Sequence, residues 1–154
     1  MEFTAAKEFA LMTLREQPLP DQMMLADTPD KAVEFWQATI ASQPRFNGEV
    51  ENFAVLFLNT RRRVKGFQIV TQGTADTLLV HPREVFRVAI LAGAAALILL
   101  HNHPSGEASP SEADIKVTRD LIRAGQLLKI EILDHVIVGN QQRASLRELG
   151  YFAA

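Results

Sequence analysis

Two histidines and an aspartate occur in the sequence with a spacing that suits a metal ion. His101 and His103 are two residues apart, and Asp114 follows a short distance later. In an extended chain, side chains two positions apart point to the same side, so the two imidazoles can converge on one ion. Two imidazoles and a carboxylate form a three-ligand Zn²⁺ set. Three protein ligands leave a fourth position for water, which is typical of catalytic rather than structural zinc.

An unbroken apolar run and a turn surround the two histidines. Residues 94–100 are all apolar, which is typical of a strand buried on both faces of a sheet. Pro104, Ser105 and Gly106 are turn-forming residues that reverse the chain directly after His103. The histidines are therefore expected at the end of a central strand, where the functional sites of α/β sheets usually lie.

A helix is predicted after this turn. Ser109 is the expected N-cap, Pro110 the first helical residue and Gly125 the residue that ends the helix. Ser111 and Asp114 are three residues apart, so they share one face of this helix. That face continues into an apolar stripe directed inward. Asp114 is therefore aimed at the interior, where a carboxylate needs a partner or a metal.

The order His-x-His, seven residues, Ser-x-x-Asp resembles the JAMM signature of JAB/MPN-type metallopeptidases. The fuller string HNHPSG…PS…D resembles the RadC branch of that superfamily, as do residues 51–58, 81–86 and 133–139. The likeness covers roughly residues 48–150. It implies the JAB/MPN fold, an α/β (α+β) three-layer arrangement in which helices flank a mixed, cytidine-deaminase-like sheet. It also implies a zinc-dependent metallohydrolase that cleaves peptide or isopeptide bonds.

The resemblance implies two further site residues. The family places a glutamate just before its first core strand, where it acts as general base and then acid. Glu51 matches this position relative to the strand predicted over 53–58. Glu49 stays an alternative, because in an extended chain it would point to the same side. Ser111 corresponds to the family serine that stabilises the oxyanion, although a serine at a helix start can also serve only the backbone.

Three motif residues are open to more than one interpretation. Asp134 and His135 also match the RadC branch. This pair could orient a metal ligand through a hydrogen bond or make a separate functional contact, or it could be a satisfied pair in the core or at the sheet edge. Asn102 lies between the two histidines and points to the opposite side. It is expected to bond backbone groups and not the metal.

Helices alternate with the strands of a mixed, largely antiparallel sheet in the rest of the predicted order. Helices are expected over 3–16, 29–42, 82–92 and 110–124, and strands over 53–58, 64–71, 77–80, 94–100, 129–138 and 143–146. The first two helices form a predicted N-terminal extension, 1–47, ahead of a metal-binding domain, 48–154. Residues 1–47 contain no glycine. The helix-hairpin-helix region of many RadC-type proteins needs glycine-centred turns, so the sequence resembles a short form without it.

Composition narrows the classes of function. The chain has 154 residues, 47% of them hydrophobic, and a net charge of −2, whereas nucleic-acid-binding domains usually show a basic excess. It has no cysteine, which excludes disulfides, thiolate ligands and the cysteine pair of zinc nucleobase deaminases. No apolar run has the length of a membrane span, and the first residues do not resemble a secretory signal. A cytoplasmic location is expected.

The sequence indicates the binding partners of the protein less specifically than it indicates the chemistry of the site. A peptide or protein substrate follows from the expected hydrolysis, and a non-catalytic or DNA-repair-associated binding module is the alternative. The basic cluster Arg61, Arg62 and Arg63 falls at the tip of a predicted hairpin. These arginines are expected to be solvated surface residues, and contact with nucleic acid is the alternative. The helices predicted over 3–16 and 29–42 could pack on the domain or form a homodimer interface.

Overall fold

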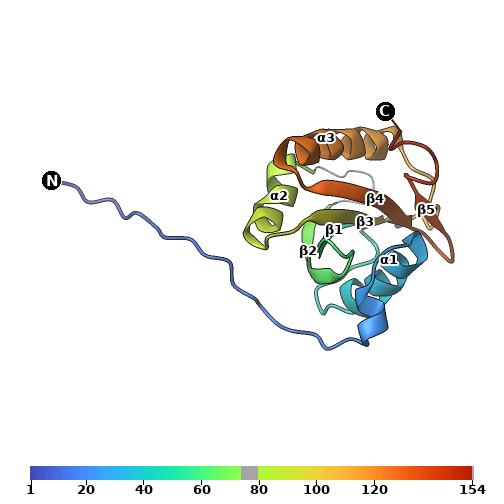
Figure 1. Ribbon diagram of the computed structural model, residues 1–154, viewed down its shortest axis with the longest axis horizontal. Coiled ribbons are helices and arrows are strands. Elements are labelled where there is room, and N and C mark those ends of the chain that lie inside the picture. The colour runs from blue at the N-terminus through green and yellow to red at the C-terminus, as the bar shows by residue number, and fades with distance from the viewer. Residues whose placement is uncertain (74–79, 154) are drawn as a thin grey trace.

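A mixed five-stranded sheet with helices on both faces forms the body of the protein (Figure 1). The computed structural model describes residues 1–73 and 80–153. The strands are β1 (Asn52–Leu58), β2 (Val64–Gln72), β3 (Ala96–Asn102), β4 (Glu131–Val138) and β5 (Arg143–Ser145). The main helices are α1 (Pro29–Phe35), α2 (Pro82–Leu91) and α3 (Glu112–Leu128). The strand predicted over 77–80 lies, apart from Val80, outside the described residues.

The strand order is β2-β1-β3-β4-β5. Only β3 and β4 pair in parallel, and the other neighbours are antiparallel. Every residue of β1 and β3 is buried, because these strands lie inside the sheet and helices cover both faces. This burial explains the unbroken apolar runs in both segments. The predicted mixed sheet is confirmed, and none of the helices in the described part of the chain is long and apolar enough to cross a bilayer.

Alternation along β1 and β3 divides the core into two layers. Even-numbered side chains pack against α1 and the π-helical turn η2 (Trp36–Ile40), and odd-numbered ones pack against α2 and α3. The first layer includes Phe35, Trp36, Ile40, Leu56, Ile98 and Leu100, and the second includes Phe53, Val85, Phe86, Leu97, Leu99 and Leu121. The three-layer prediction is confirmed. Because His101 is odd-numbered, it lies on the face that α2 and α3 cover, with its ring stacked against Phe53.

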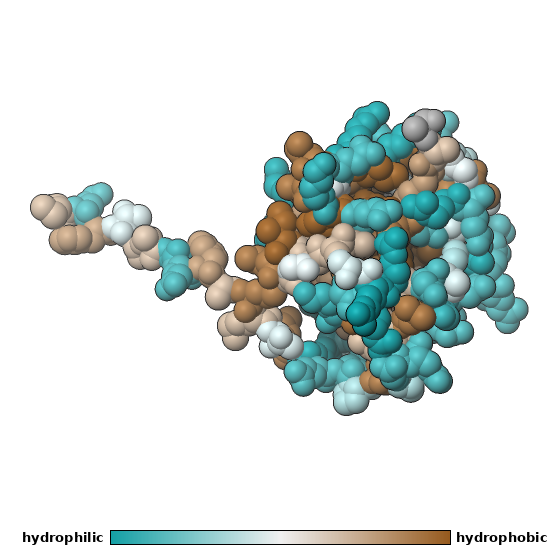
Figure 2. Space-filling model, viewed as in Figure 1, coloured by the Kyte–Doolittle hydropathy of each residue, from teal (hydrophilic) through white to brown (hydrophobic). Residues whose placement is uncertain are grey.

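The N-terminal helix predicted over 3–16 is wrong. Residues 1–20 have no regular secondary structure, and the part before Gln17, which bonds the Ala38 carbonyl, extends away from the domain (Figure 1). Phe3, Phe9 and Leu14 are 84–89% exposed, and Figure 2 shows apolar side chains along this segment. A single helix of this length is marginal in water unless its apolar face packs on a partner. The segment makes no such packing here, so its helical periodicity is not realised.

The second N-terminal helix begins as predicted. The Thr28 side chain accepts a hydrogen bond from the Lys31 amide, and Pro29 occupies the first turn. Regular α-helix ends at Phe35 and continues as the π-helical turn to Ile40. This segment contributes Phe35 to the first core layer.

Both ends of α3 differ from the prediction. The N-cap is Ser111, not Ser109, and the helix passes through Gly125 to end at Leu128, with Lys129 in the left-handed conformation. Gly125 is inside the helix because the chain folds back over it. The Ile130 amide donates to the Gly125 carbonyl at 2.9 Å, and a Cβ at Gly125 would lie 2.4 Å from the Ile130 carbonyl oxygen.

Gly125→Ala is expected to cost about 2–3 kcal/mol through overpacking, the upper part of the usual range, because the close contact is with a backbone oxygen. This cost outweighs the roughly 1 kcal/mol by which alanine exceeds glycine in a helix interior. Chemical denaturation measures the difference. Gly66→Ala is the matched control, because a Cβ at Gly66 meets nothing within 4 Å. A Gly125→Ala variant as stable as the wild type would contradict the close approach of Ile130.

Candidate metal centre

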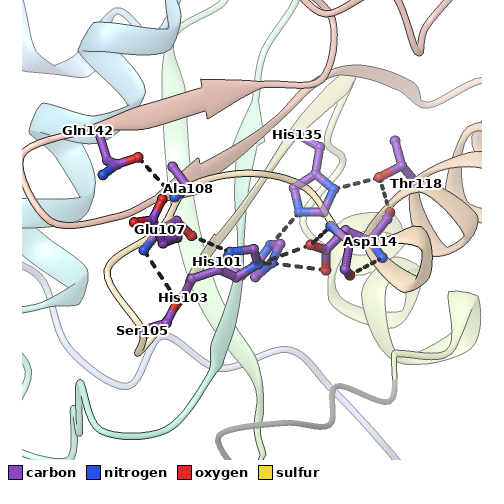
Figure 3. A network of polar contacts seen from close by, with 10 residues as sticks. His101, His103, Ser105, Glu107, Ala108, Asp114, Thr118, His135 and Gln142 are labelled. Carbon is purple, nitrogen blue, oxygen red and sulfur yellow. Dashed lines mark hydrogen bonds and ion pairs between the residues drawn. The ribbon is translucent and has the colours of Figure 1, made fainter.

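The three predicted metal ligands converge at the end of β3 and the start of α3 (Figure 3). The Nε2 atoms of His101 and His103 are 3.0 Å apart. His101 Nε2 lies 3.2 Å from Asp114 Oδ1, and His103 Nε2 lies 3.0 Å from Asp114 Oδ2. His101 and Asp114 are buried, and His103 is half-buried. These side chains are the only cluster of three or more potential metal ligands within the described residues.

A tight loop orients His103. The Gly106 amide donates to the His103 carbonyl at 2.9 Å, and Gly106 adopts a φ of 88°, which favours glycine. His103 Nδ1 lies 2.7 Å from the Glu107 carbonyl oxygen. A carbonyl oxygen can only accept, so Nδ1 carries the hydrogen and Nε2 is left to face the cluster. The loop packs against Gly139, where a Cβ would come within 2.4 Å of the Gly106 carbonyl oxygen.

The first turn of α3, which begins after the N-cap Ser111, positions Asp114. Ser111 Oγ accepts from the Asp114 amide at 3.1 Å, and Asp114 Oδ2 accepts from the Ser111 amide at 2.8 Å. This reciprocal pair is a capping box with aspartate at its third position. One carboxylate therefore caps α3 and also completes the triad.

The Asp114 carboxylate and the imidazoles of the cluster interact through hydrogen bonds and charge. Burial acts to raise the pKa of Asp114, but hydrogen bonds with His101 and His103 outweigh it and hold that pKa far below its usual range. The hydrogen bond with Asp114 is the main cause that raises the pKa of His103, and the Glu107 carbonyl and the charge of Glu51 add to it. The cluster thus keeps an ionised carboxylate between imidazoles that face it, a charge balance that suits a cation.

The donor set fits a zinc ion. With bonds of about 2.0–2.1 Å, neighbouring ligand atoms of a tetrahedral zinc lie roughly 3.3 Å apart. The nitrogen and oxygen donors that face one another are 3.0–3.2 Å apart. Imidazole and carboxylate are ordinary ligands of zinc and of other first-row divalent metals. The geometry therefore supports a metal site, and the donor types are compatible with zinc and with other first-row divalent metals.

The sheet register brings Glu51 to the same site. Phe53 of β1 pairs with His101 of β3 as the terminal pair of this antiparallel ladder. Glu51 precedes Phe53 by two residues and His103 follows His101 by two residues, so both lie at the same end of the sheet. Glu51 is half-buried, and its charge contributes to the raised pKa of His103. Glu49 is exposed in the turn before β1. This arrangement supports Glu51 over Glu49, and its catalytic role stays a prediction.

Asn102 holds the segment that carries Glu51. Its Oδ1 accepts from the Asn52 amide at 2.8 Å, and its Nδ2 donates to the Val50 carbonyl at 3.0 Å. The prediction that Asn102 bonds backbone groups is confirmed. These two bonds fix the residues on either side of Glu51 to the end of β3.

The Asp134-His135 pair divides between the two faces of the sheet. Asp134 Oδ2 accepts from Ser145 Oγ at 2.6 Å and Oδ1 from the His135 amide at 2.7 Å, so it is satisfied away from the triad. Burial raises the pKa of Asp134. The His135 ring faces the triad, and its Nε2 lies 2.7 Å from His101 Nδ1. Burial, and then the charge of His101, lowers the pKa of His135.

Thr118 is the site residue that sequence reasoning left without a role. Its Oγ1 lies 2.6 Å from His135 Nδ1 and 2.7 Å from the Asp114 carbonyl oxygen. Its position one helical turn after Asp114 predicts an inward-facing side chain. No spacing in the sequence indicates its partner, because His135 arrives from another strand.

The basic hairpin tip lies far from the triad. β1 runs from the triad toward the tip, and its seven residues span about 23 Å. Arg62 pairs with Glu131 at 3.6 Å, and Arg63 pairs with Asp21. Contact between nucleic acid and the tip residues Arg61, Arg62 and Arg63 stays a prediction, and such a contact would be made at the opposite end of the sheet.

Comparison with known proteins agrees with the fold. The family model of the RadC-like JAB domain matches residues 26–151. UPF0758 protein tlr1707 of Thermosynechococcus vestitus is 46% identical over 134 residues, which cover 87% of this chain and 49% of that protein. UPF0758 protein BH3032 of Halalkalibacterium halodurans is 42% identical over 153 residues, which cover 98% and 62%. The chain thus spans about half to two thirds of the length of these relatives. It belongs to the RadC-like JAB domain family.

Proposed function

We propose that the protein is a zinc-dependent, JAMM-type metallohydrolase that cleaves an amide bond of a peptide or isopeptide. The convergence of His101, His103 and Asp114 is the observation that carries this proposal. The resemblance of the motif to JAB/MPN metallopeptidases supports it. The alternative, a non-catalytic or DNA-repair-associated binding module, does not require a complete ligand set beside a second carboxylate.

In this proposal the three ligands bind the metal and Glu51 transfers protons. His101, His103 and Asp114 would hold the metal. Zinc bound there would polarise a carbonyl group and lower the pKa of water to about 7. Glu51 would take the proton of the attacking water and deliver it to the leaving amine, a role typically worth about 10²–10⁴ in rate.

Ser111 would stabilise the oxyanion that forms on the substrate. Its Oγ accepts from the Asp114 amide, which leaves the hydroxyl hydrogen free to donate. Ser111 is exposed, so a substrate can reach it. Loss of one such donor costs roughly 10²–10³ in rate. The capping contact and the proposed contact use different parts of the hydroxyl, so one does not exclude the other.

Metal content is the first test. Purified protein is expected to bind about one zinc per chain, measured by elemental analysis. Zinc affinity is expected to fall with decreasing pH, because a proton competes for His103. The raised pKa of His103 moves this competition above the ordinary imidazole value of about 6.5. Chelator competition at several pH values measures the effect, and protein that binds no transition metal would overturn the proposal.

Hydrolysis is the second part of this test. Zinc-loaded protein is expected to cleave members of a mixed library of peptides and isopeptide-linked peptides, with products identified by mass spectrometry. The matched control is the same preparation after zinc removal by a chelator. Zinc binding without cleavage of any library member would overturn the hydrolase assignment and leave the metal site intact.

A further inference from the structure

A buried chain of hydrogen bonds runs behind the metal-facing side of His101 (Figure 3). His101 Nδ1 lies 2.7 Å from His135 Nε2, His135 Nδ1 lies 2.6 Å from Thr118 Oγ1, and Thr118 Oγ1 lies 2.7 Å from the Asp114 carbonyl oxygen. The His101, His135 and Thr118 side chains are fully buried. The chain therefore begins on one ligand and ends on the backbone of another.

The hydrogens in this chain can be placed by counting donors. Each contact is short enough to need one hydrogen between its two atoms. The Asp114 carbonyl can only accept, so the single Thr118 hydroxyl hydrogen points to it. Thr118 Oγ1 must then accept from His135 Nδ1. A neutral imidazole has one N–H, so His135 Nε2 is bare and must accept from His101 Nδ1. His101 Nε2, on the opposite side of that ring, is then the atom that faces the cluster as an acceptor.

We propose that Thr118 and His135 are positioning residues that set the tautomer and orientation of His101 for metal binding. This inference rests on the proposed metal site. The Asp114 carbonyl fixes the Thr118 hydroxyl, Thr118 fixes His135, and His135 fixes His101. His103 is fixed separately by the Glu107 carbonyl, so each imidazole has its own partner behind it. Groups that orient a ligand in this way typically change metal affinity by about 10–100-fold when they are lost.

Zinc affinity of Thr118 variants tests the inference. Thr118→Val keeps the shape of the side chain but removes the acceptor for His135 Nδ1, and we expect zinc affinity to fall by about 10–100-fold. Thr118→Ser keeps the hydroxyl and should retain affinity near that of the wild type. Thr39→Val is the matched control. Thr39 is also buried and donates to the carbonyl four residues earlier, Phe35, but on the other face of the sheet.

The zinc affinities of the three variants distinguish a positioning role of Thr118 from the absence of one. Affinity lost in Thr118→Val and retained in both Thr118→Ser and Thr39→Val supports the inference. Unchanged affinity in Thr118→Val overturns it, and so does an equal loss in Thr118→Val and Thr118→Ser. Circular dichroism of each variant shows that the comparison is made on folded protein.

Ring nitrogen chemical shifts provide a second readout that needs neither zinc nor substrate. In the wild type, ¹⁵N–¹H NMR is expected to show His135 protonated at Nδ1, and Thr118→Val is expected to move that proton toward Nε2. A wild-type His135 protonated at Nε2 overturns the inference. If the protein binds no zinc, the proposed function fails, and this NMR result still decides how the chain from Thr118 to His101 is arranged.

Discussion

Asp114→Asn is expected to lower zinc affinity by more than about 100-fold, beyond the range seen when only a supporting group is lost. The variant keeps the shape of the side chain and removes its charge. An amide oxygen can still accept from the Ser111 amide, as Asp114 Oδ2 does now at 2.8 Å, so the cap of α3 is retained. What is lost is the negative charge that balances the cation and holds His101 and His103 in place. Chelator competition measures the change.

Asp120→Asn is the matched control for this loss. Asp120 lies on the same helix, where it pairs with Lys116 at 2.7 Å near the surface. The same substitution there is expected to leave zinc affinity unchanged. If Asp114→Asn bound zinc as tightly as the wild type, Asp114 would not be a ligand. The site would then have to be rebuilt around His101 and His103 alone.

Local pattern was enough to predict that His101, His103 and Asp114 lie close together. The apolar run before His101 indicated a buried strand, and β3 is buried along its whole length. The helical spacing of Ser111 and Asp114 indicated a shared face, and both residues meet in one capping box. Both features leave a mark on residues close in sequence, the first as an apolar run and the second as a helical spacing, and such marks are what periodicity can detect.

Sequence pattern failed where the packing of the folded chain overrides local propensity. Gly125 carries an ordinary signal for a helix end, but Ile130 folds over it and the helix continues. The apolar residues of 3–16 have helical spacing, but no partner covers them. Thr118 and His135 meet only because β4 pairs in parallel with β3 beneath α3. The contact between Thr118 and His135 thus joins elements whose relative placement is set by the whole core.

Glu51 could be predicted as a site residue only from the resemblance to the family, and not from its spacing in the sequence. It lies about fifty positions before the histidines, so no local pattern connects it to them. The family motif placed it at the start of a strand, and the antiparallel pairing of Phe53 with His101 brings the start of β1 to the end of β3 that carries the histidines. Asn102, set between the two histidines, bonds the residues on either side of Glu51. The end of β3 therefore positions Glu51 through the hydrogen bonds of Asn102.

Glu51→Gln is expected to reduce hydrolysis by about 10²–10⁴-fold and to leave zinc affinity close to that of the wild type. Glutamine keeps the size of the side chain but cannot take a proton from water. The rate is measured on whichever library peptide the zinc-loaded wild type cleaves. Glu49→Gln is the matched control, because Glu49 is exposed outside β1 and its loss should leave the rate unchanged.

A readout without substrate accompanies this prediction. The hydrogen bond with Asp114 is the main cause of the raised pKa of His103, and the charge of Glu51 adds to it. Removing that charge favours the neutral imidazole, so Glu51→Gln should lower the pKa of His103 in the zinc-free protein, whereas Glu49→Gln should not. NMR titration of the His103 ring measures both. If Glu49→Gln abolished hydrolysis and lowered this pKa while Glu51→Gln did neither, the general base would be Glu49, and the register of β1 would not determine it.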